Sequence, residues 1–554
     1  MAIWWTIFMI SLFPLALCQD GPVVHISGGP VMGVTERFTE NKYIFVDKDI
    51  NIFRGIPFAE PPVGQLRWAN PVPKSAWSGT WNATYYRPIC PQALPSSTGN
   101  EEDCLYLNVY APSTVPVGGA AVMVYIYGGA YNVGWAHQTT YIGNALAATG
   151  DVIVVTANYR LGVLGFLSTG DSAIPGNYGM YDQVAALEWV QNNIAAFGGD
   201  PSRVTIFGQS AGGCSVGLHV LSPLSENLFQ YAIMESGTAL TPFAYNGDIN
   251  QAISEAHRLG DDLNCIYSTN EDLLSCLRSH TARDVLTTAL KFTFLSAPVI
   301  DGVFLIDHPE VLMQTGQFKH TNIIAGSNKD EGLIFGLAEF PAAISAFNPP
   351  PMDRDAYETS FPKYLTGNLN DLLKDGVRNQ YVDWSTADQA DADYLDAFNR
   401  QITDETFVAP TDAFLRYFVS SSIGPTTAYS YHMTHAPSVS AWQINLIGPR
   451  WMEATHCEEL QFVFGWPFLP EVQNWKSKNL NSDEKTLSVQ IMKYWTNFAN
   501  TGDPNGVDVP SWPTFTIPEL EYKEIAVGLP TQRALRAGEN YFWNSLAPAL
   551  RAAN

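Results

Sequence analysis

The chain has 554 residues, of which 46% are hydrophobic and 15% charged, so it is long enough to bury a large core. With 54 acidic and 30 basic side chains its formal net charge is −24, which argues against nucleic acid and anionic membrane surfaces as partners. We interpret this charge as a contribution to solubility.

The N-terminal residues 1–18 are almost wholly apolar and carry no charged side chain. They resemble a secretory signal peptide cleaved after Cys18, although the segment lacks a basic start. An uncleaved anchor is the alternative, for which this length is marginal. We therefore predict a secreted, extracellular protein with a single mature domain at 19–554. The sequon Asn82-Ala83-Thr84 predicts glycosylation of Asn82.

Secretion makes disulfide bonds plausible, and six cysteines follow the signal segment. They form two close pairs and two singles: Cys90 and Cys104, Cys265 and Cys276, then Cys214 and Cys457. The close pairs are interpreted as two stapled loops, although spacing alone does not fix the pairing. The two single cysteines are predicted to be free and buried.

Apolar, β-rich runs alternate with helical patterns along the chain. The runs occupy residues 120–127, 152–159, 204–207, 232–234, 322–325 and 427–431. Continuous apolar runs indicate strands covered on both faces, and 181–196 has helical spacing between two of them. This rhythm predicts an α/β fold with a large, mostly parallel sheet and helices on both faces. Residues 31–54 are expected to add antiparallel edge strands, and 338–407 a helical cap entered through the rigid connector 349–351.

The pentapeptide Gly208-Gln209-Ser210-Ala211-Gly212 follows one of these runs and opens a segment of small residues. A serine between two glycines on a strand-to-helix turn is typical of the nucleophile elbow of α/β-hydrolases. We therefore predict Ser210 as the nucleophile. A second match, 213–217, places Ser215 inside the predicted helix, where it is interpreted as a packing residue.

A serine hydroxyl needs a general base, usually a histidine oriented by a carboxylate, and the chain order in this fold is serine, acid, histidine. His456 lies in a polar stretch and is the predicted base, whereas His432 and His435 lie in or just after a strand and are interpreted as structural. Asp330 and Glu331 both follow the predicted strand at 322–325, and the pattern does not separate them.

The oxyanion of an ester reaction needs preset hydrogen-bond donors. The N–H of Ala211, directly after the nucleophile, is one predicted donor. The glycine-rich turn at 127–131 follows the predicted strand at 120–127 and is expected to supply the others.

Several motifs together resemble those of the type-B carboxylesterase and cholinesterase-like family over roughly residues 30 to 540. They are Phe53-Arg54-Gly55-Ile56-Pro57-Phe58, Glu102-Asp103-Cys104-Leu105-Tyr106-Leu107-Asn108, Gly128-Gly129-Ala130 and Gly208 to Gly213. The segments 166–171, 195–201 and 494–505 are most similar to the bile salt-activated lipases of this family.

The resemblance implies roles for particular residues. It places the acid at Glu331, where the bile salt-activated lipases carry Asp, supports His456 as the base, and implies Ser236 as a serine near the triad. It implies that the oxyanion donors are Gly129, Ala130 and Ala211. It also implies the disulfides Cys90–Cys104 and Cys265–Cys276, and the ion pairs Arg54–Glu102 and Arg160–Asp182.

One departure of this sequence from the family's pattern concerns the substrate. Cholinesterases carry a tryptophan in the first cysteine loop, whereas 91–103 holds no aromatic residue, which disfavours choline specificity. Phe243 and Phe335 are candidates for an apolar substrate pocket, with core packing as the alternative. The C-terminus lacks the proline-rich repeats of mammalian bile salt-activated lipases, so bile-salt activation is in doubt.

These observations predict a serine ester hydrolase that acts on small-molecule or lipid esters through an acyl-enzyme, without a metal or organic cofactor. Contact with bile salts or a lipid interface and the oligomeric state stay open. The alternatives are a non-catalytic adhesion protein of the neuroligin kind and a narrow-specificity, cholinesterase-like esterase.

Overall fold

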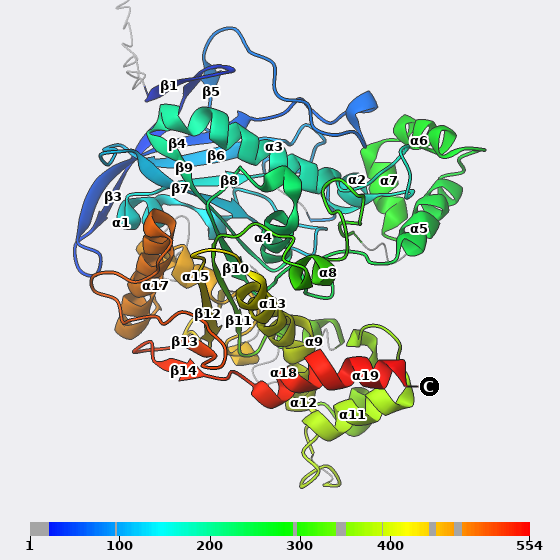
Figure 1. The fold of residues 1–554 in the computed structure, drawn as a ribbon. Helices are drawn as coiled ribbons and strands as arrows, with labels where there is room; N and C mark the ends of the chain where they lie inside the picture. The colour runs from blue at the N-terminus through cyan, green and yellow to red at the C-terminus, as the bar shows by residue number, and fades with distance from the viewer. Residues whose placement is uncertain are drawn as a thin grey trace, which may run out of the picture.

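The structure is a computed structural model that describes residues 21–94, 97–291, 296–339, 351–389, 392–441, 450–469 and 479–553. The predicted signal peptide at 1–18 lies outside the described residues, as do Pro349 and Pro350 of the predicted connector. An 11-stranded sheet runs through the molecule in the order β14-β13-β12-β11-β10-β9-β7-β8-β6-β4-β3 (Figure 1).

The centre of this sheet is parallel. Neighbouring strands pair in parallel from β8 through β7, β9, β10, β11 and β12 to β13. Their bounds are β7 Ala120–Ile126, β8 Ile153–Ala157, β9 Gly199–Gln209, β10 Tyr231–Glu235, β11 Asn322–Asn328, β12 Ala428–Met433 and β13 Glu521–Ile525. The six strands up to β12 correspond to the six predicted apolar runs, so the predicted parallel core is confirmed. Each is buried over most of its length, as unbroken apolar runs require.

Antiparallel strands complete both edges of the sheet. At one edge they are β3 Val34–Glu40, β4 Val46–Pro57 and β6 Tyr106–Pro112, and at the other β14 Thr531–Arg533. The predicted antiparallel pairing within 31–54 is therefore confirmed. A separate three-stranded sheet contains β1 Val23–Ile26, β2 Gly29–Met32 and β5 Trp81–Asn82.

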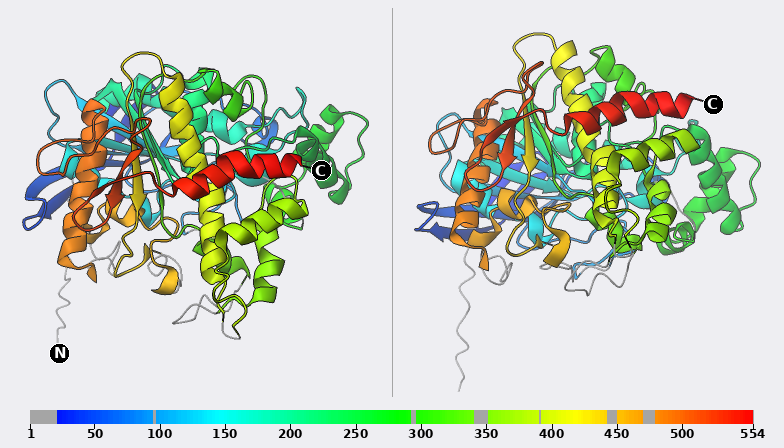
Figure 2. Two further views of the ribbon diagram at one scale, coloured as in Figure 1. Left: turned by 60° about the horizontal axis from the view of Figure 1, so that its bottom comes forward. Right: turned by 90° about the horizontal axis from the view of Figure 1, so that it is seen from below.

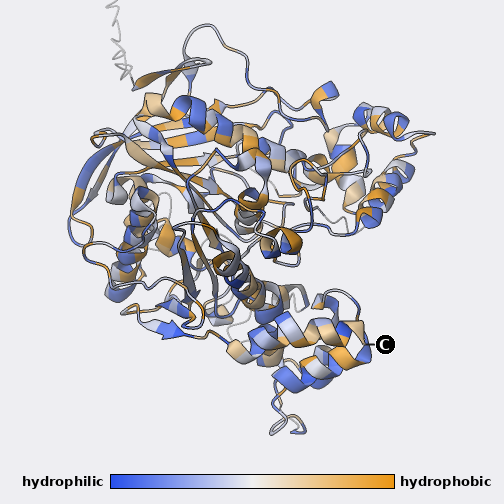
Figure 3. Ribbon diagram, in the orientation of Figure 1, coloured by the Kyte–Doolittle hydropathy of each residue, from blue (hydrophilic) through white to orange (hydrophobic). Residues whose placement is uncertain are grey.

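Helices cover both faces of the sheet, as Figure 1 shows. One face carries α1 Asn144–Gly150, α15 Leu460–Val463 and α17 Ser482–Thr501. The other carries α3 Tyr178–Asn193, α4 Ala211–Leu221, α8 Pro309–Gln314 and α13 Ala409–Ser421. All 11 residues of α4 are buried, because this helix of small and apolar residues packs directly under β9 and β10. Apolar colour gathers on the central strands in Figure 3.

Two smaller apolar clusters flank the sheet. The first joins the predicted cap to the C-terminus and includes residues of α9 Leu333–Glu339, α10 Arg354–Ser360, α11 Asp371–Tyr381, α12 Leu395–Thr403, η11 Phe542–Leu546, which follows α18 Ala537–Tyr541, and α19 Ala547–Ala552. Figure 2 shows α18 and α19 lying beside these helices. The second contains α2 Gly162–Phe166, α5 Ile249–Asp262, α6 Asn270–Ser279 and α7 Ala282–Ala289. Across the part of the chain that the structure describes, no helix combines the length and apolarity that crossing a membrane requires.

Candidate active site

Ser210 lies on the sharp turn between β9 and α4, with φ 59° and ψ −128°. This conformation is strained for a residue with a side chain, and such strain is concentrated at functional sites. The flanking glycines allow it: a Cβ on Gly212 would lie 2.0 Å from the carbonyl oxygen of Ile126, and one on Gly208 would lie 2.6 Å from the same atom. The local sequence therefore fits the close packing of this turn against the end of β7.

The turn that carries Ser210 is also held by the neighbouring strand β10. The backbone N–H of Ser210 donates to the carbonyl oxygen of Glu235 at 2.8 Å, and a Cβ on Gly237 would lie 2.4 Å from the Ser210 carbonyl oxygen. Ser236, between these two residues, is fully buried with a positive φ of 49°. Its hydroxyl has no hydrogen-bond partner among the described residues. The structure thus brings Ser236 to the end of the strand beside the elbow.

The turn after β11 separates the two candidate acids. Glu331 is fully buried: its Oε1 accepts the backbone N–H of Asn328 at 2.7 Å, and its Oε2 lies 2.5 Å from Nδ1 of His456. Asp330 lies elsewhere, because its Oδ1 accepts from the side-chain amide of Asn399 at 3.0 Å and its Oδ2 lies 3.4 Å from Nζ of Lys329. The carboxylate that faces the histidine is that of Glu331.

His456 reaches this position from the loop before α15. Backbone pairing of Asp330 with Thr455 fixes the loop against the end of β11. Burial lowers the pKa of His456, but Cys457 and the Glu331 carboxylate raise it, and the net pKa lies above the usual histidine range. Burial also raises the pKa of the Cys457 thiol, which keeps it protonated, so the charge that stabilises an imidazolium here is that of Glu331.

The other two histidines of this region have different partners. Nδ1 of His432 lies 3.3 Å from the hydroxyl of Ser327, and Nε2 of His435 lies 3.2 Å from a carboxylate oxygen of Glu484. Burial lowers the pKa of His432 to about 3, which keeps its ring neutral. Neither is brought to Glu331 by these contacts.

The glycine-rich turn after β7 lies directly against the elbow. A Cβ on Gly128 would lie 2.9 Å from Cβ of Ser210. Gly129 has φ +115° and Ala130 has φ 51°, and the carbonyl of Gly129 accepts the N–H of Val133 at 3.1 Å, which closes the turn. Ala211 is the first residue of α4, where a backbone N–H has no acceptor within its own helix. The turn that carries Gly129 and Ala130 and the first residue of α4 therefore both adjoin the Ser210 turn.

An aromatic group extends from the histidine toward the predicted pocket. The Phe407 ring is fully buried, with its centroid 5.0 Å from that of His456. Phe243 and Phe335, both half-buried, lie 6.0 and 6.3 Å from Phe407 by the same measure. The two predicted pocket residues are thus joined to His456 through Phe407, a residue that sequence reasoning missed.

Buried carboxyl groups lie behind the triad. Glu459 Oε2 accepts from the side-chain amide of Asn328 at 2.5 Å, and burial together with the Glu331 charge raises the pKa of Glu459 to about 7. Glu235 accepts from the indole N–H of Trp495 at 2.6 Å, and burial raises its pKa well above the usual range. Sequence reasoning missed both, because buried acids resemble solvated loop charges in a sequence.

The structure contains the disulfides Cys90–Cys104 and Cys265–Cys276. Cys214 and Cys457 are free, but only Cys214 is fully buried; Cys457 is half-buried, so the prediction of burial was wrong for it. Cys457 follows His456 in a turn where its φ is 73°, a backbone conformation that sequence does not reveal for a cysteine.

One of the two expected ion pairs is absent. Arg160 and Asp182 are paired at 2.7 Å, as expected. Arg54 pairs with Glu36 of the adjacent strand β3, whereas Glu102 accepts from Arg67 at 2.6 Å. The Arg54–Glu102 expectation was therefore wrong, because an acid nearer in the sheet takes the Arg54 side chain.

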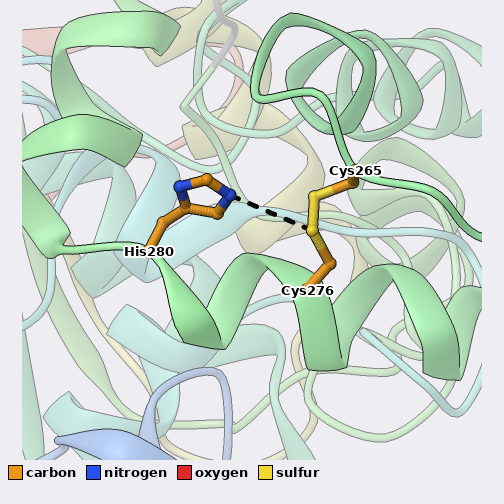
Figure 4. Close-up of side chains that lie close together, drawn as sticks. All are labelled: Cys265, Cys276 and His280. Carbon is orange, nitrogen blue, oxygen red and sulfur yellow. Dashed lines mark hydrogen bonds between the residues drawn. A yellow bond between two sulfur atoms is a disulfide. The ribbon is translucent and has the colours of Figure 1, made fainter.

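Within the described residues, one group of histidine, cysteine or acidic side chains is close enough to share a metal ion, namely Cys265, Cys276 and His280. Figure 4 shows that its two sulfurs form a disulfide, with the His280 ring 3.9 Å from the Cys276 sulfur (Figure 4). A disulfide offers no thiolate, so this group stabilises a loop rather than forming a metal site.

Comparison with known proteins agrees with this geometry. The model of the carboxylesterase family matches residues 20–543. An acetylcholinesterase of Bungarus fasciatus is 37% identical over 91% of this chain and 84% of its own length. A cholinesterase of Mus musculus is 37% identical over 90% and 83%, and an acetylcholinesterase of Danio rerio 34% identical over 98% and 92%. The chain belongs to the carboxylesterase family. It has the α/β-hydrolase fold of that family and is a carboxylic ester hydrolase.

Proposed function

We propose that this protein is a secreted serine hydrolase of carboxylic esters that acts through an acyl-enzyme, with Ser210, His456 and Glu331 as its triad. The observation that carries the proposal is the 2.5 Å contact between Glu331 Oε2 and His456 Nδ1. Nε2 of the same histidine lies 3.2 Å from the side-chain amide of Gln209, the residue before Ser210 on its strained strand-to-helix turn. A buried carboxylate on Nδ1 orients the imidazole and stabilises its protonated form.

In the first half of the reaction His456 removes the hydroxyl proton of Ser210 as its oxygen attacks the ester carbonyl. The imidazolium, held by Glu331, then protonates the leaving alcohol. In the second half His456 activates a water molecule, which attacks the acyl-enzyme and releases the acid and Ser210.

The oxyanion of each tetrahedral intermediate is stabilised by the backbone N–H groups of Gly129, Ala130 and Ala211. Donors fixed before the reaction stabilise developing charge without reorganisation. The closed turn at Gly129 and the start of α4 support this role, because both are rigidly packed against the Ser210 turn. Ser236, buried behind Ser210, supports the position of the elbow.

For the substrate we propose a lipid-type or general ester, as in the bile salt-activated lipases. The loop 91–103 carries no aromatic side chain to bind a quaternary ammonium group. The half-buried rings of Phe243 and Phe335, which pack on the buried Phe407, offer an apolar surface that suits an acyl chain. A cholinesterase-like specificity is the second candidate, and the names of the 37% identical relatives favour it.

Secretion is proposed from the apolar segment 1–18 together with the two disulfides, which persist in oxidising compartments. The side chain of Asn82 is exposed, as glycosylation requires. The single mature domain at 19–554 and the Asn82 glycan stay predictions. A non-catalytic, neuroligin-like role is disfavoured because the three triad residues are all present.

The test uses the mature chain and its Ser210→Ala variant with p-nitrophenyl esters of short and long acyl chains, and with a choline ester, with and without bile salt. We expect wild type to hydrolyse acyl esters and to react with a fluorophosphonate, and the variant to do neither. Preferential hydrolysis of the choline ester would favour the second candidate. A folded wild type inert toward every ester and toward the fluorophosphonate would contradict the proposed function.

A further inference from the structure

A chain of side-chain contacts ends on the nitrogen of His456 that does not face Glu331. Gln209, directly before the nucleophile, is 1% exposed, and its amide nitrogen lies 3.2 Å from Nε2 of His456. The amide oxygen of Gln209 accepts from the thiol of Cys457 at 3.3 Å. Four side chains are thus connected in the order Cys457, Gln209, His456, Glu331.

One placement of the protons satisfies every contact in this chain. A protonated thiol donates to the Gln209 carbonyl oxygen, which turns the NH₂ group toward His456. Because an NH₂ group only donates, Nε2 of His456 must accept, and the imidazole proton lies on Nδ1, facing Glu331. This tautomer is the one that a general base requires, and the hydrogen-bond network assigns it.

The surroundings of His456 favour its charged form. Glu331 contacts it directly, and Glu459 lies behind it. Cys457 and Glu458 follow it in the same loop. Other titratable groups of the packed elements include Asp330 with Lys329, which also pairs with Glu453; Glu235 at the end of β10; and Asp404 and Glu405, which pair with Arg536 and Arg551. A base must be neutral before it removes a proton, so another group must oppose the preference of these acids for a charged imidazole.

We propose that Gln209 is the group that does so. It is a positioning residue whose NH₂ group, oriented by Cys457, donates to Nε2 of His456 and holds the imidazole neutral. The inference rests on the proposed function. A donor on Nε2 stabilises the neutral imidazole and is incompatible with a proton at that nitrogen, so it opposes the effect of the carboxylates. As the reaction begins, the Ser210 hydroxyl takes the place of Gln209 at Nε2.

The test compares pH profiles of kcat/KM for wild type, Gln209→Leu, Gln209→Glu, Cys457→Ala and Cys457→Ser. The acidic limb of this profile reports the pKa of the base in the free enzyme. We expect the limb to move to higher pH in Gln209→Leu and further in Gln209→Glu, where a carboxylate would face Nε2. A shift of one unit would lower activity on the acidic limb about tenfold while leaving the plateau in place.

Cys457→Ala and Cys457→Ser form a matched pair. Without the thiol the Gln209 amide is free to turn its oxygen toward Nε2 of His456. The acidic limb of the profile should therefore also move to higher pH in Cys457→Ala. A serine hydroxyl still donates, so Cys457→Ser should keep the wild-type profile. A merely structural role would lower the plateau or the thermal midpoint in both variants alike.

A second readout does not need activity. The Nδ1–H between His456 and Glu331 should give a far-downfield proton resonance, assigned by its absence in His456→Ala. The pH at which this resonance titrates should shift among the variants in the same order as the acidic limb of kcat/KM. Unchanged acidic limbs and titrations in folded Gln209→Leu and Gln209→Glu would overturn the proposal. A wild type inactive toward all esters would instead contradict the proposed function, and the resonance would still decide the role of Gln209.

Discussion

The ring of Phe407 packs against the imidazole of His456, with the ring centroids 5.0 Å apart and the planes inclined by 44°. Phe407 belongs to the π-helical turn η7, Asp404–Val408, inserted between α12 and α13. Such turns are frequent at functional sites, because the extra residue re-aims a side chain. Here the turn places a fully buried ring between the proposed base and the half-buried Phe243 and Phe335.

This arrangement predicts how acyl-chain length affects activity. If Phe335 lines the acyl site, Phe335→Ala should lower kcat/KM for long-chain p-nitrophenyl esters on the order of tenfold, because apolar contact area is lost. Short-chain esters should be affected much less. The control is Phe45→Ala, which removes a ring that is 77% exposed and belongs to no cluster near His456. Equal losses for short and long esters would mean that Phe335 only packs.

The parallel strands could be predicted because their apolar runs are continuous, but their limits could not. β9 begins at Gly199, five residues before the predicted run at 204–207, because the polar segment between them continues the strand. The elbow could be predicted because close backbone contacts leave no room for a side chain at either glycine, so the motif itself carries the signal.

Other parts of the site depend on tertiary packing that a sequence does not reveal. Asp330 and Glu331 are adjacent, and only the direction of the turn decides which one faces His456. In the sequence Phe407 looks like any apolar residue of a helix, and nothing in the sequence pattern marks its turn as π-helical. Gln209 did carry a signal, since it lies inside the nucleophile motif, but its contact with a residue 247 positions away could not be foreseen.

The adjacent acids allow a matched test of the triad. Glu331→Gln keeps the size of the side chain but removes the charge that stabilises the imidazolium, so kcat should fall by about 10⁴-fold. Asp330→Asn changes the neighbour, which contacts Asn399 and Lys329 instead of His456, and kcat should change by less than about tenfold. Steady-state kinetics on one p-nitrophenyl ester measures both.

Thermal unfolding of the two acid variants separates chemistry from folding. Glu331→Gln should remain folded, with its loss confined to turnover and to the fluorophosphonate reaction. If Asp330→Asn lost activity as strongly as Glu331→Gln while both stayed folded, the assignment of the acid would be wrong.

The turn of the proposed oxyanion hole should tolerate no side chain at Gly129. A Cβ there would lie 2.0 Å from the Val133 carbonyl oxygen, at a φ of +115° that other residues rarely adopt. Gly129→Ala should therefore displace the N–H donors and lower kcat by about 10²–10³-fold. Gly538→Ala is the control, because a Cβ at Gly538 meets nothing within 4 Å. Full activity in folded Gly129→Ala would exclude this turn from the site.

A buried histidine far from the triad predicts the acid sensitivity of the fold. His219 of α4 is fully buried, with Nε2 2.9 Å from Oε1 of Gln183 and Nδ1 2.7 Å from the hydroxyl of Ser225. Burial lowers the pKa of His219 from 6.5 to about 3. The folded protein therefore keeps the ring neutral at pH values where the unfolded chain binds a proton.

The difference between the folded and unfolded pKa of His219 decides how stability changes with pH. The contribution of a neutral His219 to stability is complete above pH 6.5 and is lost as the pH falls from there toward about 3. At pH 5 the loss amounts to about 2 kcal/mol of the free energy of unfolding. In His219→Gln the urea midpoint should be lower at pH 7.5 but should fall less between pH 7.5 and 5 than in wild type. His25→Gln, at an exposed position of β1, should retain the wild-type pH dependence. An equally steep decline in His219→Gln would show that other groups govern the acid sensitivity.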